Sequence, residues 1–219
     1  HKTHLVHGRT FTLGTLAGNE VVLFLSGVSM VNATMTTQLA LSTFNVTGLL
    51  FSGVAGGVNP GLNVGDVTVP GRWGHNQEQL FARATLSGWD YGWHSAPFGI
   101  YGMMVPQNVE VTSSRGEPDA VEPRFWFPVD PEMLRVARRA AESATLTQCT
   151  REEVCLGHEP KVMVGGSGVS GSTFVDNARY RGWVWETFAA QALDMETAAV
   201  AHVAYVNEVP YLAFRSLSD

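Results

Sequence analysis

The sequence contains no long hydrophobic run and no run of basic residues. Its longest apolar stretch, Val21 to Val28, is interrupted by Ser26 and Gly27, and a membrane-spanning helix needs about 20 consecutive apolar residues. Asp and Glu outnumber Lys and Arg by 20 to 14, which gives a formal net charge of −6. Surfaces that bind nucleic acid are basic. We therefore expect neither a membrane nor a nucleic acid as a partner.

Cysteine is scarce as well, since the chain has only Cys149 and Cys155. His158 alone lies close enough in sequence to join them as a ligand, so we expect no metal site, and nothing else in the chain indicates a cofactor. Two interpretations of the pair remain open. A disulfide would indicate an oxidising compartment, whereas two unpaired thiols would leave the compartment open.

The composition is that of a globular protein, with 45% hydrophobic residues among 219. This length is enough for one well-buried α/β domain. The chain has no internal repeat, low-complexity tract or Pro/Ser-rich linker. We therefore expect a single domain over residues 1–219.

Helical and strand patterns alternate along the chain. The patterns predict helices over 29–42, 131–144, 176–187 and 196–207, and strands over 46–52, 64–70, 161–164, 190–193 and 210–214. This alternation indicates a helix–sheet–helix sandwich, and an early hairpin over 8–26 predicts that the sheet is mixed. Asp130 and Asp176 are expected N-caps. The segment 75–128 has little periodicity and is expected to be a long functional loop.

Two glycine-rich segments follow predicted strands. The first, residues 53–61, is either a loop that binds a small molecule or a tight backbone path where a Cβ would clash. The second, residues 165–172, precedes Phe174, which could stack on a planar ligand. The alternative for the second segment is an ordinary turn from a strand into a helix capped by Asp176.

Four charged residues follow the last two predicted strands. Asp194 and Glu196 lie where one strand passes into a helix, and Arg215 and Asp219 lie at the far end of the next. Taken singly, Glu196 could compensate a helix dipole, and Arg215 with Asp219 could form an exposed ion pair. Because ligands bind beyond the carboxyl ends of such strands, the set together favours a functional site.

An ordered set of segments carries a family resemblance. These segments are Ser26 to Ala33, Ser52 to Gly57, Asn63 to Pro70, Asp194 to Glu196 and Arg215 to Asp219. The chain resembles the nucleoside phosphorylase and nucleosidase superfamily over nearly its whole length. Within it, the chain is similar to 5′-methylthioadenosine/S-adenosylhomocysteine nucleosidases and plant bark storage proteins. The resemblance implies a three-layer α/β fold with a central mixed sheet, lacking the family's N-terminal strand and C-terminal helix.

The resemblance also implies roles for individual residues. Asp219 matches the acid that protonates purine N7, for which burial would raise the carboxyl pKa. Glu196 matches the carboxylate that binds the ribose hydroxyls, and Arg215 matches a residue that orients the reacting groups. Implied substrate-binding residues are Ala55 and Gly56 beside the base and ribose, Phe174 and Val175 at the base, Met195 under the ribose, and Ser218.

The implied activity is hydrolysis of a purine N-ribosidic bond. Family phosphorylases carry an Arg for phosphate before the first glycine segment, where this chain has Leu50, Phe51 and Ser52. A phosphate dianion would lack a strong charge-assisted partner there. We therefore expect a nucleosidase that releases adenine from 5′-methylthioadenosine, S-adenosylhomocysteine or a related nucleoside, acting as a homodimer.

Two rival functions remain open at this point. One is a phosphorylase that holds phosphate with other residues, and the other is a non-catalytic protein that binds or stores a nucleoside. The compartment is open too. The cysteine pair and the storage-protein resemblance favour a periplasmic or secreted protein slightly over a cytoplasmic one.

Overall fold

A mixed sheet of eight strands forms the centre of the computed structural model, which describes residues 2–112 and 117–219. Its strands are β4 (Leu49–Gly57), β5 (Val67–Val69), β6 (Arg72–His75), β13 (Trp126–Pro128), β14 (Val162–Val164), β15 (Ser167–Ser170), β16 (Ala190–Asp194) and β17 (Tyr211–Leu217). Their order is β13-β6-β15-β16-β4-β17-β5-β14. Strand β4 is parallel to β17 and antiparallel to β16, so the sheet is mixed, as predicted.

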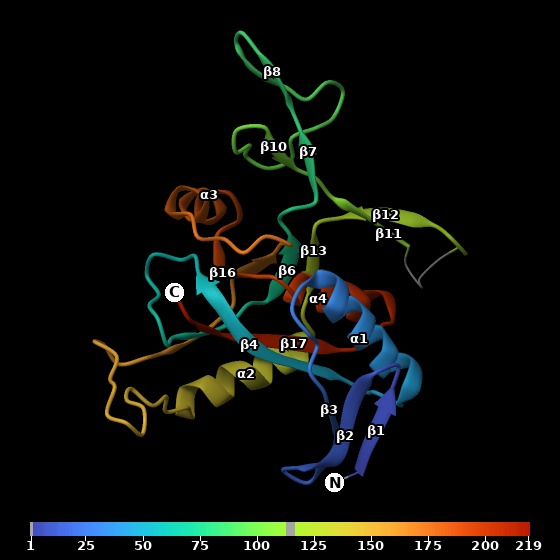
Figure 1. The fold of residues 1–219 in the computed structure, drawn as a ribbon, viewed down its shortest axis with the longest axis vertical. Helices are drawn as coiled ribbons and strands as arrows, with labels where there is room; N and C mark the ends of the chain where they lie inside the picture. The colour runs from blue at the N-terminus through green and yellow to red at the C-terminus, as the bar shows by residue number, and fades with distance from the viewer. Residues whose placement is uncertain (1, 113–116) are drawn as a thin grey trace.

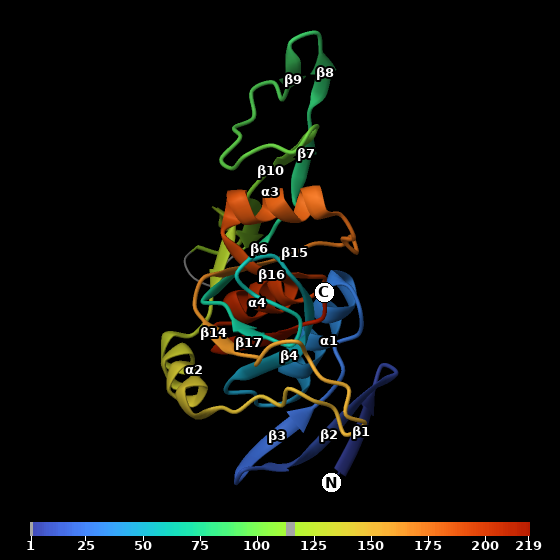
Figure 2. The ribbon, with the colours of Figure 1, turned by 90° about the vertical axis from the view of Figure 1, so that its left-hand side faces the viewer.

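Four helices flank this sheet: α1 (Met30–Thr43), α2 (Pro131–Ser143), α3 (Ala178–Phe188) and α4 (Thr197–Val206). Helix α4 packs against β6, β13, β15 and β17, and α1 packs on α4. Helix α2 contacts β14 and β17, and α3 contacts β16. Figure 1 shows α1 and α4 on one side and α2 and α3 on the other, and Figure 2 shows α4 behind the sheet. The predicted three-layer α/β architecture is confirmed.

The N-terminal hairpin does not belong to this sheet. Strands β1 (Lys2–Val6), β2 (Arg9–Leu16) and β3 (Asn19–Leu23) form a separate antiparallel sheet at the bottom of Figure 1. The prediction that the hairpin makes the central sheet mixed is therefore wrong. The antiparallel pairs of the central sheet are instead β13 with β6, β16 with β4, and β17 with β5.

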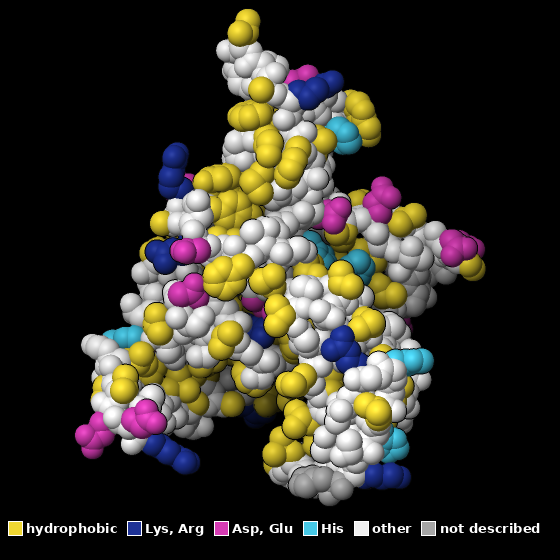
Figure 3. All heavy atoms as spheres, viewed as in Figure 1, with side chains coloured by type: hydrophobic (Ala, Val, Ile, Leu, Met, Phe, Trp, Pro, Cys, Tyr) yellow, Lys and Arg dark blue, Asp and Glu magenta, His cyan; other side chains and the backbone are white. Residues whose placement is uncertain are grey.

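The described residues of segment 75–128 form several short strands, so the prediction of a loop without regular structure is wrong, whereas its functional role stays a prediction. After β6 the segment contains β7 (Gln79–Phe81), β8 (Arg83–Thr85), β9 (Gly88–Asp90), β10 (Met104–Pro106), β11 (Val109–Thr112) and β12 (Val121–Arg124). They pair as β7–β10, β8–β9 and β11–β12, and the first four strands form an arm that projects at the top of Figure 1. Strands of three or four residues are too short for a period of two to appear in the sequence. Hydrophobic side chains gather along this arm in Figure 3.

The main core lies between the sheet and α4. Trp73 and Phe127 are fully buried there, beside a run of small residues on α4. A Cβ at Gly168 would lie 2.7 Å from the Trp73 ring, so the second glycine segment, which contains β15, lets that ring pack against the strand. In the described residues, no helix combines the length and the hydropathy needed to cross a bilayer.

One of the two predicted helix caps is confirmed. Asp130 Oδ1 accepts a hydrogen bond from Met133 N at 2.8 Å at the start of α2. Helix α3 begins one residue later than the prediction requires, and its cap is Asn177, whose Oδ1 accepts from Tyr180 N at 2.9 Å. The assignment of Asp176 as the cap is therefore wrong. Asp and Asn cap helices about equally well, so the sequence does not decide between the two neighbours.

Candidate active site

The first glycine segment is largely a strand. Strand β4 runs from Leu49 to Gly57, so the predicted strand end at Ser52 is wrong. Residues 53–57, which were predicted to be loop, belong to the strand. Gly53 pairs with Arg215 in the parallel ladder between β4 and β17. A Cβ at Gly53 would overlap Nη1 of Arg215 and lie 3.0 Å from its Cζ. The interpretation as a tight backbone path therefore holds at Gly53.

Arg215 lies inside β17 rather than beyond its end, and its residue surface is only 3% exposed. Its Nε lies 2.7 Å from Asp194 Oδ2, and its Nη2 lies 3.8 Å from Glu196 Oε2. The guanidinium carbon is 4.3 Å from the centre of the Phe51 ring. The alternative of an exposed ion pair between Arg215 and Asp219 is wrong, because Arg215 is buried against other carboxylates.

Asp194 organises the junction between β16 and α4. Ser170 Oγ donates to Asp194 Oδ1 at 2.5 Å, and the same oxygen accepts the backbone N–H groups of Glu196 at 3.2 Å and Thr197 at 3.1 Å. Thr197 Oγ1 donates to Asp194 Oδ2 and accepts from Arg215 Nε at 2.9 Å. The sequence pattern pointed to Asp194 but not to Ser170 or Thr197. The one available signal was Thr197, three residues after Asp194 at a helix start.

Glu196 is held at the mouth of α4 with its carboxylate directed away from its own helix. It is the N-cap residue of α4, at the positive end of the helix dipole, but its side chain makes no capping hydrogen bond to α4. Oε1 accepts a hydrogen bond from Ser29 N at 2.8 Å, and Oε2 faces Arg215. Ser29 precedes α1 and has a φ of 83°. Met195, which separates Asp194 and Glu196 in the chain, is half-buried.

Asp219 and Ser218 extend β17 alongside the end of β4. Ser218 N donates to Ala55 O at 3.0 Å, and Gly57 N donates to Asp219 O at 2.8 Å. Both carboxylate oxygens of Asp219 lie 3.6 Å from the position that a Cβ on Gly56 would take. The structure thus brings four of the expected site residues together, namely Ala55, Gly56, Ser218 and Asp219. The Asp219 side chain is exposed here, and its role as the acid stays a prediction.

Phe174 and Val175 lie on the segment between β15 and α3. Val175 packs against the aromatic and aliphatic cluster around Phe188. Phe174 is 77% exposed and, within the described residues, makes no ring contact with another aromatic side chain. The structure does not place Phe174 against the carboxylates, and its stacking on a purine stays a prediction.

A family model described as "Phosphorylase superfamily" matches residues 1–219. The chain belongs to this superfamily. It is 28% identical over 221 residues to bark storage protein A of Populus deltoides, covering 98% of this chain and 69% of that protein. It is 29% identical over 220 residues to the 5′-methylthioadenosine/S-adenosylhomocysteine nucleosidase of Bacillus thuringiensis, covering 100% and 76%. The structure of the Helicobacter pylori nucleosidase matches with a TM-score of 0.68 at 22% identity, and the match covers 100% of this chain and 78% of that one. At this identity the structural match supports the fold alone.

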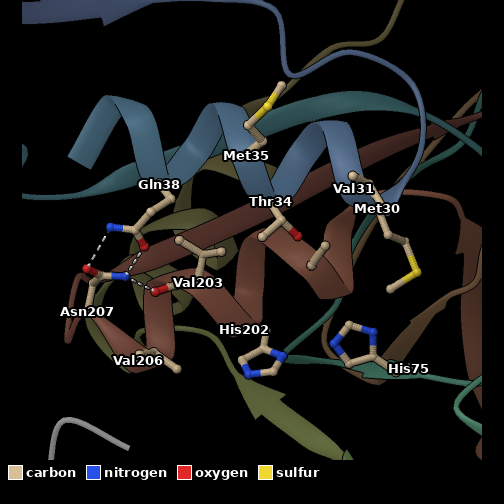
Figure 4. A pocket seen from close by; sticks show the side chains of 11 residues that line it. Met30, Val31, Thr34, Met35, Gln38, His75, His202, Val203, Val206 and Asn207 are labelled. Carbon is tan, nitrogen blue, oxygen red and sulfur yellow. Dashed lines mark hydrogen bonds between the residues drawn. The ribbon is translucent and has the colours of Figure 1, made fainter. Parts of the chain in front are cut away.

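A cavity lies beside the site, and its lining does not include the carboxylates of the site. Its volume is about 470 Å³, and it opens between α1 and α4. Figure 4 shows His75 and His202 at one end and Gln38 bonded to Asn207 at the other. Burial lowers the pKa of His75 to about 4, with a further contribution from His202, and burial also lowers the pKa of His202. Both rings are therefore neutral at neutral pH.

Cys149 and Cys155 form a disulfide. The interpretation of the pair as a bridge is therefore confirmed, and that of two unpaired thiols is wrong. Among the residues that the structure describes, no cluster of three or more His, Cys, Asp or Glu side chains is arranged to hold a metal ion.

Proposed function

We propose that this protein is a nucleosidase that hydrolyses the N-ribosidic bond of a purine nucleoside. The proposed substrates are 5′-methylthioadenosine, S-adenosylhomocysteine or a related nucleoside, with adenine as the product. The observation that carries the proposal is the fixed carboxylate of Glu196, held between Ser29 N and Arg215, together with the Asp219 carboxylate beside Gly56. The nucleosidase names of several relatives support it.

The proposed chemistry divides the work between two carboxyl groups. Glu196 binds the ribose hydroxyls and stabilises positive charge on the sugar as the bond to the base breaks, and its fixed position limits reorganisation. Asp219 donates a proton to purine N7, which makes the base a better leaving group. Arg215 holds Glu196 in place and is itself fixed by Asp194 and by the Phe51 ring.

Water rather than phosphate is the proposed nucleophile. The position before the glycine segment holds Phe51, which lies against the guanidinium of Arg215 instead of supplying a cation. Arg215 is already paired with Asp194 in the buried interior. A phosphate dianion at Arg215 would therefore have to compete with Asp194 for this charge-assisted donor.

The deciding experiment measures adenine release from 5′-methylthioadenosine by the full-length protein, in phosphate-free buffer and again with phosphate added. Release without phosphate supports the hydrolase. Release only with phosphate would make the protein a phosphorylase and overturn the choice of water. Absence of release from any purine nucleoside in either buffer would sink the catalytic proposal.

The role of Asp219 has its own test. We expect Asp219→Asn to lower the rate of adenine release at least 100-fold, because a general acid contributes on the order of 10² to 10⁴. The melting temperature should stay near that of the parent, since the side chain is exposed. Near-full activity in this variant would contradict the acid assignment.

A second candidate is a protein that binds or stores a nucleoside without cleaving it. The similarity to bark storage protein A supports this alternative, as does the exposed side chain of Phe174. Titration calorimetry with adenine and 5′-methylthioadenosine distinguishes the two functions. Binding of either ligand without any product, in both buffers, would favour the storage role.

We also propose a homodimer and an oxidising compartment. The apolar side chains that α1 exposes, Val31 and Met35, support a second copy of this chain as the partner. The disulfide supports a location outside the reducing cytosol, such as the periplasm or the exterior of the cell.

A further inference from the structure

A fully buried carboxylate, Asp66, lies just before β5 and outside the set of proposed catalytic residues. Its Oδ2 accepts from Asn63 N at 2.9 Å, and its Oδ1 accepts from Lys161 N at 2.9 Å. His158 Nε2 lies 3.4 Å from the same Oδ1. Burial alone raises the pKa of Asp66, but the two backbone N–H groups, His158 and the charge of Lys161 outweigh it, so the pKa lies below its usual value. The carboxylate therefore ties the turn 63–66 to the segment 158–161.

The same turn holds the chain that carries Asp219. Leu217 N donates to Asp66 O at 2.8 Å, and Gly65 N donates to Leu217 O at 2.8 Å. On the other side, the bonds between Ser218 N and Ala55 O and between Gly57 N and Asp219 O hold this chain against β4. The position of the Asp219 carboxyl thus depends on one well-ordered strand, β4, and on one irregular turn.

A loop closed by the disulfide packs against that turn. Residues 148–158, called here the disulfide loop, are closed by Cys149–Cys155 and by the bond from Leu156 N to Gln148 O at 2.9 Å. Leu156 lies so close to Gly65 that a Cβ on Gly65 would overlap its Cδ1, and Gly65 has a φ of 90°. The disulfide loop therefore places Leu156 against Gly65 and His158 beside Asp66.

We propose that Asp66 is a positioning residue for Asp219 and that the disulfide loop holds Asp66 and its turn in place. This positioning role rests on the proposed nucleosidase function, because Asp66 and the disulfide loop would act on the transfer of the proton from Asp219 to the purine. Displacement of a reacting group by about 1 Å can lower a rate about 100-fold. Loss of the brace should therefore affect proton delivery to the leaving group, and not the binding of ribose by Glu196.

The test compares two substrates of the full-length protein. Adenine needs a proton to leave, whereas p-nitrophenolate from p-nitrophenyl riboside leaves without one. We expect Asp66→Asn to lower kcat for 5′-methylthioadenosine by about tenfold or more, with KM nearly unchanged. The rate with p-nitrophenyl riboside should stay within about twofold. Asp130→Asn is the matched control, because it also removes a carboxylate that accepts a backbone N–H, and Asn caps a helix equally well.

The disulfide loop is tested by the double variant Cys149→Ser with Cys155→Ser. The same selective loss on 5′-methylthioadenosine is expected, in the same direction as for Asp66→Asn, and treatment of the parent protein with a thiol reductant should reproduce it. Equal loss on both substrates, or full activity in both variants, would overturn the proposal, because a merely structural role does not distinguish leaving groups.

Hydrogen exchange separates this proposal from the proposed function. If the parent protein cleaves no nucleoside, the catalytic proposal fails, but the amides of Gly65 and Leu217 still report the brace. We expect both amides to exchange about tenfold faster in Asp66→Asn than in the parent, and to be unchanged in Asp130→Asn. Unchanged exchange in Asp66→Asn would remove the positioning role whatever the activity.

Discussion

At the residue scale, the missing side chain of Gly53 makes room for Arg215. The guanidinium occupies the space where a Cβ would stand, and from there it reaches Asp194 and Glu196. The space left by Gly53 on β4 thus accommodates the charged side chain of Arg215 on β17. Even a methyl group at residue 53 should displace Arg215 and disturb its contacts with both carboxylates.

We therefore expect Gly53→Ala to lower adenine release at least tenfold and to destabilise the fold by a few kcal/mol. The reason is that Arg215 must move and leave Asp194 buried without its partner; breaking such a pair costs about 3–5 kcal/mol. Urea denaturation and the adenine assay measure the two effects. Gly182→Ala is the control: nothing lies within 4 Å of the new Cβ, and alanine in an exposed helix stabilises by up to about 1 kcal/mol. Parent-like activity in Gly53→Ala would contradict the role given to Arg215.

His75 gives a prediction for pH dependence. Its pKa is about 4 in the folded protein against 6.5 as the ordinary value, so between these two pH values the unfolded chain binds more protons. The free energy of unfolding should therefore fall as the pH drops from 6.5 to about 4, by up to about 3 kcal/mol.

Urea denaturation at pH 7.5, 5.5 and 4.5 measures this slope. His75→Gln should flatten it, leaving the smaller contribution of His202, whose pKa is lowered in the same direction. A slope that is as steep in His75→Gln as in the parent would mean that other groups control acid stability.

At the scale of the element, two adjacent residues could each begin α3. The structure assigns the cap to Asn177, whose side chain accepts from Tyr180 N, and places Asp176 outside the helix. We expect Asn177→Ala to lower the free energy of unfolding by about 1 kcal/mol. Asp176→Ala should change it by less than about 0.5 kcal/mol. Thermal and urea denaturation of the two variants decide between the neighbours, and the reverse order of effects would restore Asp176 as the cap.

At the scale of the whole molecule, α1 leaves part of its apolar surface uncovered. Val31 is 77% exposed and Met35 is 49% exposed, and both line the open cavity between α1 and α4. Large exposed apolar patches mark interaction surfaces. This face is therefore the surface to which we assign the second copy of the chain.

Val31→Glu should shift the protein from dimer to monomer in analytical ultracentrifugation, because a carboxylate buried in an apolar interface lacks a partner. Val136→Glu on α2 is the matched control. Val136 is 50% exposed and lies on a different helix, so its substitution should leave the sedimentation unchanged. A parent that sediments as a monomer, or a Val31→Glu variant that remains a dimer, would remove this face as the interface.

Sequence patterns predicted the main helices and several strands well, because their side chains recur with the period of the element. They failed where backbone pairing decides the structure. Strand β4 runs through glycines that lack strand propensity, since β17 and β16 pair with it on both sides. The short strands of the arm offer too few residues for a pattern.

Residue types and their order along the chain were enough to predict the α/β class, the superfamily resemblance and the acidic and basic residues after the last strands. These follow from local periodicity and residue type, which folding does not alter. Three features emerge only in the folded chain: Arg215 pairs with Asp194 rather than Asp219, Cys149 bonds Cys155, and the backbone of Asp66 holds the chain leading to Asp219. Each of these contacts depends on which segments lie side by side in the folded protein. Strand order and burial determine this, and spacing along the chain does not.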